Sequence, residues 1–313
     1  MNSPSLTQTP TDAVDISVVV VAICSIPQLN RALEALAAQK TVSSFEVIVA
    51  VDPEIGDSGD LALKFPEYRF LSRAGCRTPI ELTVLGLDSA TGERIVLTED
   101  SCVATPGWLS AIASVPGNGH GAVGGVVEAM PGISNTMWAF CYVDFFRYMR
   151  PVSEGAAPTL SVCNVAYRRV DLVSLRNAWL NGFNETEMHG LLQERYGPLL
   201  FRPDAEVRVR RDVTFGDAVY ERYAFGRLFG STRVAQSPAR RRMWFALVSP
   251  ALPFLLMARM TAKARADKNL MRRFIASLPA LLTMVLAWSW GEWLGYVTGR
   301  RPRRITTAPE RMR

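Results

Sequence analysis

The sequence predicts an α/β domain on a doubly wound, mostly parallel sheet, followed by apolar helices. β-Branched runs alternate with segments of helical periodicity over residues 16–97, which is typical of a parallel sheet covered on both faces. Two of these runs end on acidic residues, and arginine-flanked apolar stretches follow residue 237. With 313 residues, the chain can bury a large core.

The individual elements follow from the hydrophobic pattern. Residues 16–22 (ISVVVVA) and 45–51 (FEVIVAV) predict buried strands, with a helix between them. Residues 68–71 and 93–97 predict two more strands, separated by a helix over 79–89. Residues 121–128 predict a further strand, and the aromatic stretch 138–148 a helix or loop. The segments 161–169, 183–196 and 199–210 complete the sheet together with an acidic helix.

Charge and cysteine content exclude several classes of protein. The formal net charge is +6, and the arginine runs 240–242, 272–273 and 300–304 adjoin apolar stretches, which favours a membrane surface over nucleic acid. Five dispersed cysteines without a Cys-x-x-Cys pair predict neither a disulfide framework nor a zinc site. Because residues 1–14 are polar and do not resemble a signal peptide, we expect the catalytic part on the cytoplasmic side of the membrane.

Acidic residues follow two of the predicted strands. Asp52 follows the strand 45–51, and Glu99 and Asp100 follow the strand 93–97. Ligands of doubly wound sheets collect beyond the carboxyl ends of the strands. Two neighbouring carboxylates can hold Mg²⁺ or Mn²⁺ against a diphosphate, although such a pair also occurs as a simple turn or helix cap. The residues alone leave both interpretations open.

Five stretches of sequence resemble a known enzyme family. They are FEVIVAVD, SATGERIVLTEDSCVATPGWL, GAVGGVVE, CNVAYRR and FNETEMHGLLQERYG, in this order over residues 15–210. In order and spacing they resemble the successive motifs of family 2 glycosyltransferases, which are inverting enzymes with the GT-A fold. The resemblance implies transfer of a sugar from a nucleotide-sugar donor to an acceptor hydroxyl.

On the donor side, the resemblance implies three carboxylates. Asp52 is similar to the aspartate that contacts the base or ribose of the nucleotide. Glu99 and Asp100 resemble the Asp-x-Asp-like motif, with Asp100 the better candidate for contacting a Mg²⁺ or Mn²⁺ ion that bridges the diphosphate.

On the acceptor side, the resemblance implies a general base in the acidic segment. Glu185 is preferred by position, and Glu187 is the alternative, because residues two apart on a helix do not face one site. Asn164 and Arg168 lie in the segment that lines the acceptor side, although Asn164 could equally be a turn residue. His189 is a second-rank candidate for positioning the acceptor or the diphosphate.

Departures from the family pattern leave rival functions open. Residues 22–25 (AICS) differ from the usual turn after the first strand, and the Gln-x-x-Arg-Trp motif of processive synthases is absent, which favours single transfer. A catalytically silent GT-A domain that acts as a membrane-bound scaffold is the main alternative. A nucleotidyltransferase is disfavoured because no glycine-rich, lysine-containing loop follows the first strand.

The sequence divides into a polar leader (1–14), a GT-A domain (15–237) and a membrane-associated segment (238–313). The apolar run 243–257, at about 15 residues, is short of the roughly 20 that cross a membrane, whereas 274–291 is long enough. Both runs could instead lie in the interface. We therefore expect membrane lipids and a lipid-linked or glycan acceptor as partners, and no nucleic acid; the oligomeric state is open.

Overall fold

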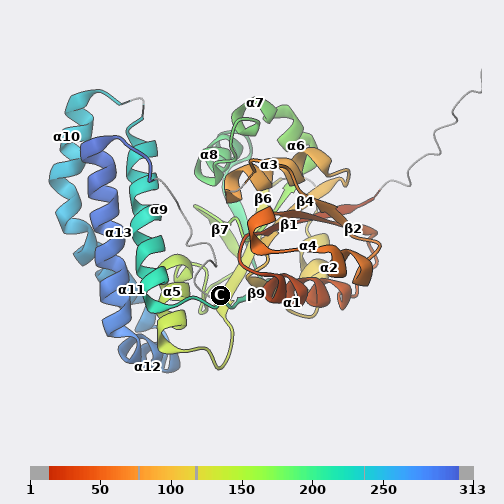
Figure 1. Cartoon of the computed structure of the whole chain (residues 1–313), viewed down its shortest axis with the longest axis horizontal. Coiled ribbons are helices and arrows are strands. Elements are labelled where there is room, and N and C mark those ends of the chain that lie inside the picture. Colours follow the sequence, from red (N-terminus) through yellow and green to blue (C-terminus); the bar gives the residue numbers. More distant parts are fainter. Residues whose placement is uncertain (1–13, 77, 117–118, 236, 303–313) are drawn as a thin grey trace, which may run out of the picture.

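An α/β domain lies beside a group of long helices, as Figure 1 shows for the computed structural model. The structure describes residues 14–76, 78–116, 119–235 and 237–302. The α/β domain contains one nine-stranded sheet with the order β3-β2-β1-β4-β8-β6-β9-β5, and β7 pairs with β9. In the view of Figure 1, α3 and α6–α8 lie above this sheet, and α1 and α2 lie below it.

The N-terminal half of the sheet is parallel, as the sequence predicts. Its strands are β1 (Ile16–Ala22), β2 (Phe45–Val51), β3 (Arg69–Leu71) and β4 (Arg94–Glu99). Its helices are α1 (Ile26–Ala37), η1 (Pro53–Ile55), α2 (Gly59–Lys64) and α3 (Pro79–Ser89). Ser25 caps α1, and a reciprocal capping box of Thr78 and Glu81 starts α3. These caps satisfy backbone N–H groups at the first turns of the two helices.

The other half of the sheet is mixed, so the parallel pairing predicted from the sequence is strongest in the N-terminal half. Its strands are β5 (Cys102–Ala104), β6 (Ala122–Ala129), β7 (Gly155–Ala157), β8 (Asn164–Arg168) and β9 (Leu199–Val209). β8 runs antiparallel between β4 and β6, and β9 runs parallel to β6. The carboxyl ends of β1, β2, β4, β6 and β9 consequently meet at one edge, together with the start of β8.

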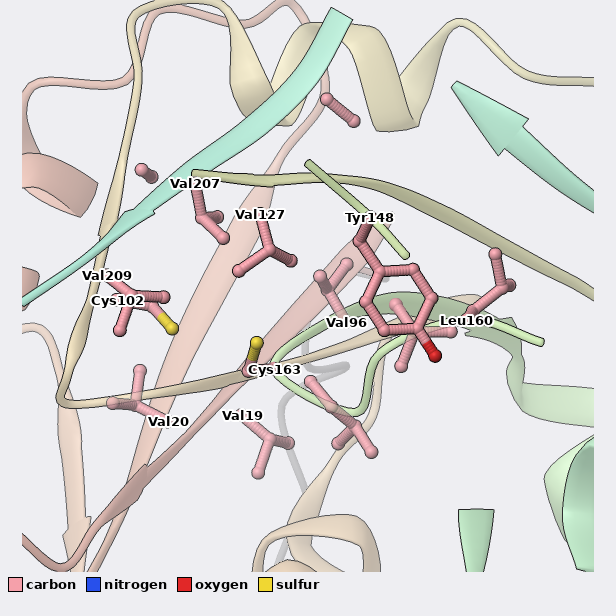
Figure 2. Close-up of a cluster of buried hydrophobic side chains, with 14 of the residues drawn as sticks. Val19, Val20, Val96, Cys102, Val127, Tyr148, Leu160, Cys163, Val207 and Val209 are labelled. Atoms are coloured by element: carbon pink, nitrogen blue, oxygen red, sulfur yellow. The ribbon is translucent and has the colours of Figure 1, made fainter. Parts of the chain in front are cut away.

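Helices pack on both faces of this half. They are α4 (Trp108–Ala113), α5 (Asn135–Phe145), α6 (Arg169–Ser174), α7 (Arg176–Trp179) and α8 (Glu185–Tyr196). The aromatic stretch 138–148 is therefore mainly helical. Figure 2 shows the apolar core between the strands, where side chains of β1, β4, β5, β6 and β9 meet Tyr148 and Leu160. Burial of this branched apolar surface is what fixes the register of the central strands.

The C-terminal helices form a layer of their own beside the α/β domain (Figure 1). They are α9 (Phe215–Arg233), α10 (Ala239–Val248), η2 (Ser249–Ala251), α11 (Leu252–Ala264), α12 (Lys268–Ala276) and α13 (Leu278–Thr298). α13 packs along α9 and also touches α5. The helix α9, which the sequence places at the end of the catalytic domain, thus packs with the tail.

Glycines allow α9 and α13 to approach closely. An added Cβ at Gly226 would lie 2.1 Å from the carbonyl oxygen of Trp288, and one at Gly291 would lie 2.0 Å from that of Tyr223. Gly230 and Gly295 make the same kind of backbone approach one turn further along the pair. Small residues spaced four apart are typical of tightly packed helices in membrane proteins.

The structure changes what the sequence indicates about the two apolar runs. The first run is part of a helical segment, Ala239–Ala264, of 26 residues, so the expectation that it is too short to cross a membrane is wrong. It is mostly exposed, with 11% of its apolar window buried. The second run is divided by a 74° bend between α12 and α13, and the two reach the length and hydropathy of a span only together. By length and composition, the described residues thus contain one helix that could cross a membrane, or two if the bent pair is one span.

Candidate active site at the carboxyl edge of the sheet

Asp100 ties the end of β4 to the turn after β1. Its Oδ2 accepts hydrogen bonds from the backbone N–H groups of Ile23 at 3.1 Å and Cys24 at 2.7 Å, and its own N–H donates to the carbonyl of Val21. The side chain is 1% exposed, and Oδ1 has no hydrogen-bond partner among the described residues. Burial raises the pKa of Asp100, and the two backbone donors oppose this shift. An orphaned, buried carboxylate oxygen thus lies at the strand edge.

Glu99 and Asp52 lie at the same edge. Burial raises the pKa of Glu99 to about 7, while the nearby Arg211 guanidinium lowers it and Asp100 raises it. Asp52 directly follows β2, donates its backbone N–H to Ala22 and accepts a hydrogen bond on Oδ1 from the N–H of Glu54 at 2.9 Å. The structure therefore brings the three donor-side candidates to neighbouring strand ends, as the sequence predicts.

Glu185 approaches this edge from the first turn of α8. Its Oε2 accepts a hydrogen bond from the backbone N–H of Val162 at 3.0 Å. Val162 lies two residues before Asn164, which pairs with Thr98 of β4, so the β8 register brings Glu185 towards Glu99. Burial raises the pKa of Glu185 to about 7, the Val162 bond lowers it, and the negative charge of Glu99 raises it further. The charge of Glu99 thus reaches Glu185 across the site, although the two residues are far apart in sequence.

Glu187 and His189 have different surroundings from Glu185. Glu187 is exposed on the outer side of α8. His189 is buried, with Nε2 at 2.9 Å from the hydroxyl of Tyr167, and burial lowers its pKa to about 4. His189 is therefore neutral near pH 7 and is held inside the domain. Among the described residues, neither Glu187 nor His189 has a contact that brings it to Glu99. These contacts therefore give no support to Glu187 as the base or to His189 as a residue that positions the acceptor or the diphosphate.

Asn164 and Arg168 are committed to contacts within the domain. Asn164 is fully buried, where its Oδ1 accepts from the indole N–H of Trp108 at 2.9 Å and its Nδ2 donates to the carbonyls of Val126 and Ala205. These bonds make it a cross-link between β8, β6 and β9. The Nε of Arg168 donates to Asp171 at 2.6 Å, at the far end of β8 from the acidic edge. The expectation that these two side chains line the acceptor site is therefore corrected. The amide of Asn164 is fully used in bonds within the domain, and the guanidinium of Arg168 lies at the opposite edge of the sheet.

Arg211 is a charged residue of this edge that the sequence interpretation missed. It follows β9, whose carboxyl end meets the edge, and the neighbouring Arg210 donates its backbone N–H to the carbonyl of Ser101 at 2.9 Å. A detectable signal exists in the sequence, because a basic pair directly follows a buried strand. From the sequence, residues 199–210 are predicted only as part of the sheet.

This architecture has a counterpart among solved structures, although sequence comparison finds none. No protein-family profile matches the sequence, and no curated protein sequence matches it. Among solved structures, the mannosyltransferase PcManGT of Pyrobaculum calidifontis, in complex with GDP-Man and Mn²⁺, matches with a TM-score of 0.56 at 15% identity, over 90% of this chain and 88% of that chain. The chain has the GT-A fold.

Weaker likenesses to other GT-A structures are also found. TarS of S. aureus (residues 1–349) has a TM-score of 0.47 at 14% identity, covering 91% of this chain and 90% of that chain. Glucosyl-3-phosphoglycerate synthase of Mycobacterium tuberculosis, with Mn²⁺, UDP-glucose and phosphoglyceric acid, has a TM-score of 0.43 at 16% identity, covering 66% and 76%. The fold rests on the mannosyltransferase match, and at 15% identity that match leaves the reaction to be argued from the site.

The carboxylates at this edge could hold a divalent metal only together with the phosphate oxygens of a bound substrate and water. Among the described residues, no group of three His, Cys, Asp or Glu side chains could hold an ion. Mg²⁺ and Mn²⁺, however, are commonly held by one or two carboxylates together with substrate phosphates and water. The unpartnered Oδ1 of Asp100 and the adjacent Glu99 carboxylate supply that smaller donor set.

Proposed function

We propose that this chain transfers a sugar from a nucleotide-sugar donor to an acceptor hydroxyl by a single displacement that inverts the anomeric carbon. The observation that carries the proposal is the approach of Glu185 to Glu99, two carboxyls from separate elements: the Val162 N–H holds Glu185 beside the start of β8, and the charge of Glu99 adds to the burial that raises the pKa of Glu185. One of these carboxylates, Glu99, can act on the donor side, and the other, Glu185, on the acceptor side. The GT-A fold supports the nucleotide-sugar as donor.

On the donor side, Asp52 contacts the nucleoside, and Glu99 and Asp100 face the diphosphate. A divalent metal held by Asp100 and Glu99 would neutralise the charge that develops on the leaving diphosphate. Asp100 is well suited to this position, because two backbone N–H groups fix its Oδ2 and thereby aim its free Oδ1.

On the acceptor side, Glu185 is the general base. The Val162 N–H fixes Oε2, and Oε1 has no protein partner among the described residues, so it can accept the proton of the acceptor hydroxyl. A pKa of about 7 is close to the operating pH, which is where a general base transfers a proton most effectively. As the acceptor oxygen bonds to the anomeric carbon, its proton passes to Glu185 and the nucleoside diphosphate leaves from the opposite face.

The tail attaches the enzyme to a membrane, with the catalytic domain on the cytoplasmic side. The helical segment Ala239–Ala264 exposes large apolar side chains, and these include Met243, Trp244, Leu247 and Phe254. Arg240, Arg241 and Arg259 lie on the same segment and suit anionic head groups. An acceptor at or in the bilayer, lipid-linked or a glycan, is consistent with this arrangement.

Ligand-induced thermal stabilisation tests the donor class. Detergent-purified protein is heated with UDP, GDP and their sugar conjugates, with and without Mn²⁺, because a ligand that binds only the folded state raises the melting temperature. We expect one nucleotide series to stabilise the wild-type protein. Absence of a shift with every nucleotide would contradict the donor site, and binding without transfer would favour a silent scaffold.

A further inference from the structure

Arg211 is placed beside the acidic turn by the backbone of β9. β5 and β9 pair Cys102 with Val209, and the next bond joins the N–H of Arg210 to the carbonyl of Ser101. Arg211 thus leaves the sheet one residue beyond the partner of the Glu99–Asp100–Ser101 turn. Arg211 lies at the start of the loop between β9 and α9, and the bond of its neighbour Arg210 to Ser101 holds this start of the loop to the sheet.

Two contacts fix the guanidinium. Its Nη2 donates to Oε1 of Glu221, on α9, at 2.9 Å, and its central carbon lies 5.4 Å from the ring centre of Phe140, on α5. The side chain is 13% exposed. Glu221 is its only hydrogen-bond partner among the described residues, and a guanidinium carries five N–H donors. Most of the fork is therefore available to a ligand.

The surrounding charges keep this cation ionised. Burial acts to lower the pKa of Arg211, but Cys24, Glu221, Glu99 and Asp100 together raise it above its ordinary value. Neither Glu99 nor Asp100 forms a direct ion pair with it within the described part of the chain. The edge thus holds a fixed positive charge whose remaining donors have no protein acceptor.

Resting on the proposed function, we infer that Arg211 binds the diphosphate of the nucleotide donor, with Glu221 as its positioning residue. A planar fork of N–H donors matches phosphate oxygens in bidentate geometry. Arg211 would also hold the negative charge that passes to the diphosphate when the glycosidic bond breaks. Because this cation is part of the chain, we expect part of the nucleotide affinity to persist when divalent metal is removed.

The neighbouring Arg222 does not offer the same chemistry. It is 3% exposed, forms an ion pair with Asp144 and packs on the rings of Phe140 and Phe225 at 4.4 and 5.1 Å. Burial lowers its pKa to about 9. Arg222 joins α9 to α5, whereas Arg211 faces the acids.

Isothermal titration in EDTA tests the inference. UDP and GDP are titrated into the wild-type protein and into Arg211→Gln, and the titrations are repeated with Mn²⁺. We expect Arg211→Gln to weaken nucleotide binding in EDTA by ~10- to 100-fold, the loss of a charge-assisted hydrogen-bonded pair. Arg208→Gln, an exposed arginine on the same strand that pairs with Glu206, is the matched control and should bind like wild type.

Loss of one partner of a half-buried ion pair can destabilise the fold, so a second variant separates the effects. Arg211→Gln/Glu221→Gln removes both charges together, and its melting temperature is measured without ligand. A folded double variant with the same loss of binding supports the inference. Wild-type affinity in a folded Arg211→Gln protein would overturn it while leaving the proposed function intact. Failure of the wild-type protein to bind any nucleotide, with or without Mn²⁺, would overturn both.

Discussion

Glu185 and Glu187 are two residues apart on one helix and have opposite surroundings. Glu185 lies under the start of β8, where the Val162 N–H holds one of its oxygens, and Glu187 is exposed. Burial, with a smaller contribution from the charge of Glu99, raises the pKa of Glu185 to about 7, which suits a general base, whereas Glu187 lies at the surface. The pair provides a variant and its control within one helical turn.

We predict that Glu185→Gln lowers the rate of sugar transfer by about 10²- to 10⁴-fold, the usual contribution of a general base. Donor binding should be retained, because Glu185 lies on the acceptor side. Glu187→Gln should transfer at the wild-type rate. Transfer assays and nucleotide titrations on both variants check this, and equal loss in the two variants would argue against the assignment.

The raised pKa of Glu185 predicts two opposite pH effects. The base acts when deprotonated, so kcat should rise as the pH passes through about 7. The folded-state pKa exceeds the ordinary value of 4.5, so the folded protein binds this proton more tightly than the unfolded chain does. The stability contribution of Glu185 is therefore greatest below pH 4.5 and is lost as the pH rises towards 7. Urea unfolding at several pH values should show a weaker pH dependence in Glu185→Gln.

The two carboxylate oxygens of Asp100 have different roles: Oδ2 accepts the backbone hydrogen bonds, and Oδ1 is proposed to bind the metal. Two substitutions separate these roles. Asp100→Asn keeps an acceptor for the N–H groups of Ile23 and Cys24, so we expect near-wild-type stability and loss of Mn²⁺-dependent nucleotide binding. Asp100→Ala leaves both donors without an acceptor and should also cost roughly 1–3 kcal/mol of unfolding free energy. Calorimetry and chemical denaturation distinguish the two outcomes. Mn²⁺-dependent binding that survives in Asp100→Asn would remove Asp100 from the metal site.

At the scale of elements, the sequence predicts the long buried strands well and misses two short ones. Long β-branched runs such as Ile16–Ala22 and Phe45–Val51 are predicted at their observed bounds, because burial on both faces leaves a continuous apolar signal. The three-residue strands β5 and β7 escape detection, and the antiparallel direction of β8 depends on pairing with β4 and β6. Direction is a tertiary property that no local pattern encodes.

The same limit applies to the site. The acids at strand ends are predictable, because the carboxyl-edge rule requires only strand order along the chain. Asn164 is predicted to lie on the acceptor side but is a buried cross-link, and Arg211 is missed. Both outcomes depend on partners distant in sequence, such as Trp108 for Asn164 and Phe140 for Arg211.

The α9–α13 pair is the element contact most sensitive to side-chain volume. We predict that Gly291→Ala lowers the unfolding free energy by at least about 2 kcal/mol, because its Cβ would lie 2.0 Å from the Tyr223 carbonyl oxygen. Gly216→Ala, in the first turn of α9, meets no atom within 4 Å and should be neutral or stabilising by ~0.5–1 kcal/mol. Denaturant titration of both variants measures the difference, and equal stabilities would show that this contact relaxes freely.

At the scale of the whole molecule, the apolar surface is concentrated on one helical layer. Leu247 and Phe254 are 75% and 78% exposed on the segment Ala239–Ala264, whereas Leu63 and Val170 are comparably exposed but lie on separate short helices, α2 and α6, of the α/β domain. Isolated exposed apolar residues are ordinary, whereas a grouped set marks an interaction surface. The layer also continues into α9, so the apolar C-terminal helices and Glu221, the partner of Arg211, belong to one packed unit.

We predict that Leu247→Gln/Phe254→Gln reduces flotation with anionic liposomes by ~10-fold or more, since burying each such side chain in an apolar medium is worth about 1.5–3 kcal/mol. Leu63→Gln/Val170→Gln, with similar exposure on the catalytic domain, should float like wild type. Equal flotation of the two double variants would place membrane attachment elsewhere.

Donor breakdown tests the central claim most directly. Release of nucleoside diphosphate from the stabilising nucleotide sugar is measured for wild type, Glu187→Gln and Glu185→Gln, with membrane lipids present as the acceptor source. We predict that wild type and Glu187→Gln release nucleoside diphosphate, and that the rate of release falls by about 10²-fold or more in Glu185→Gln. Equal release by wild type and Glu185→Gln would contradict the assigned base, and tight donor binding without release by wild type would contradict the transferase itself.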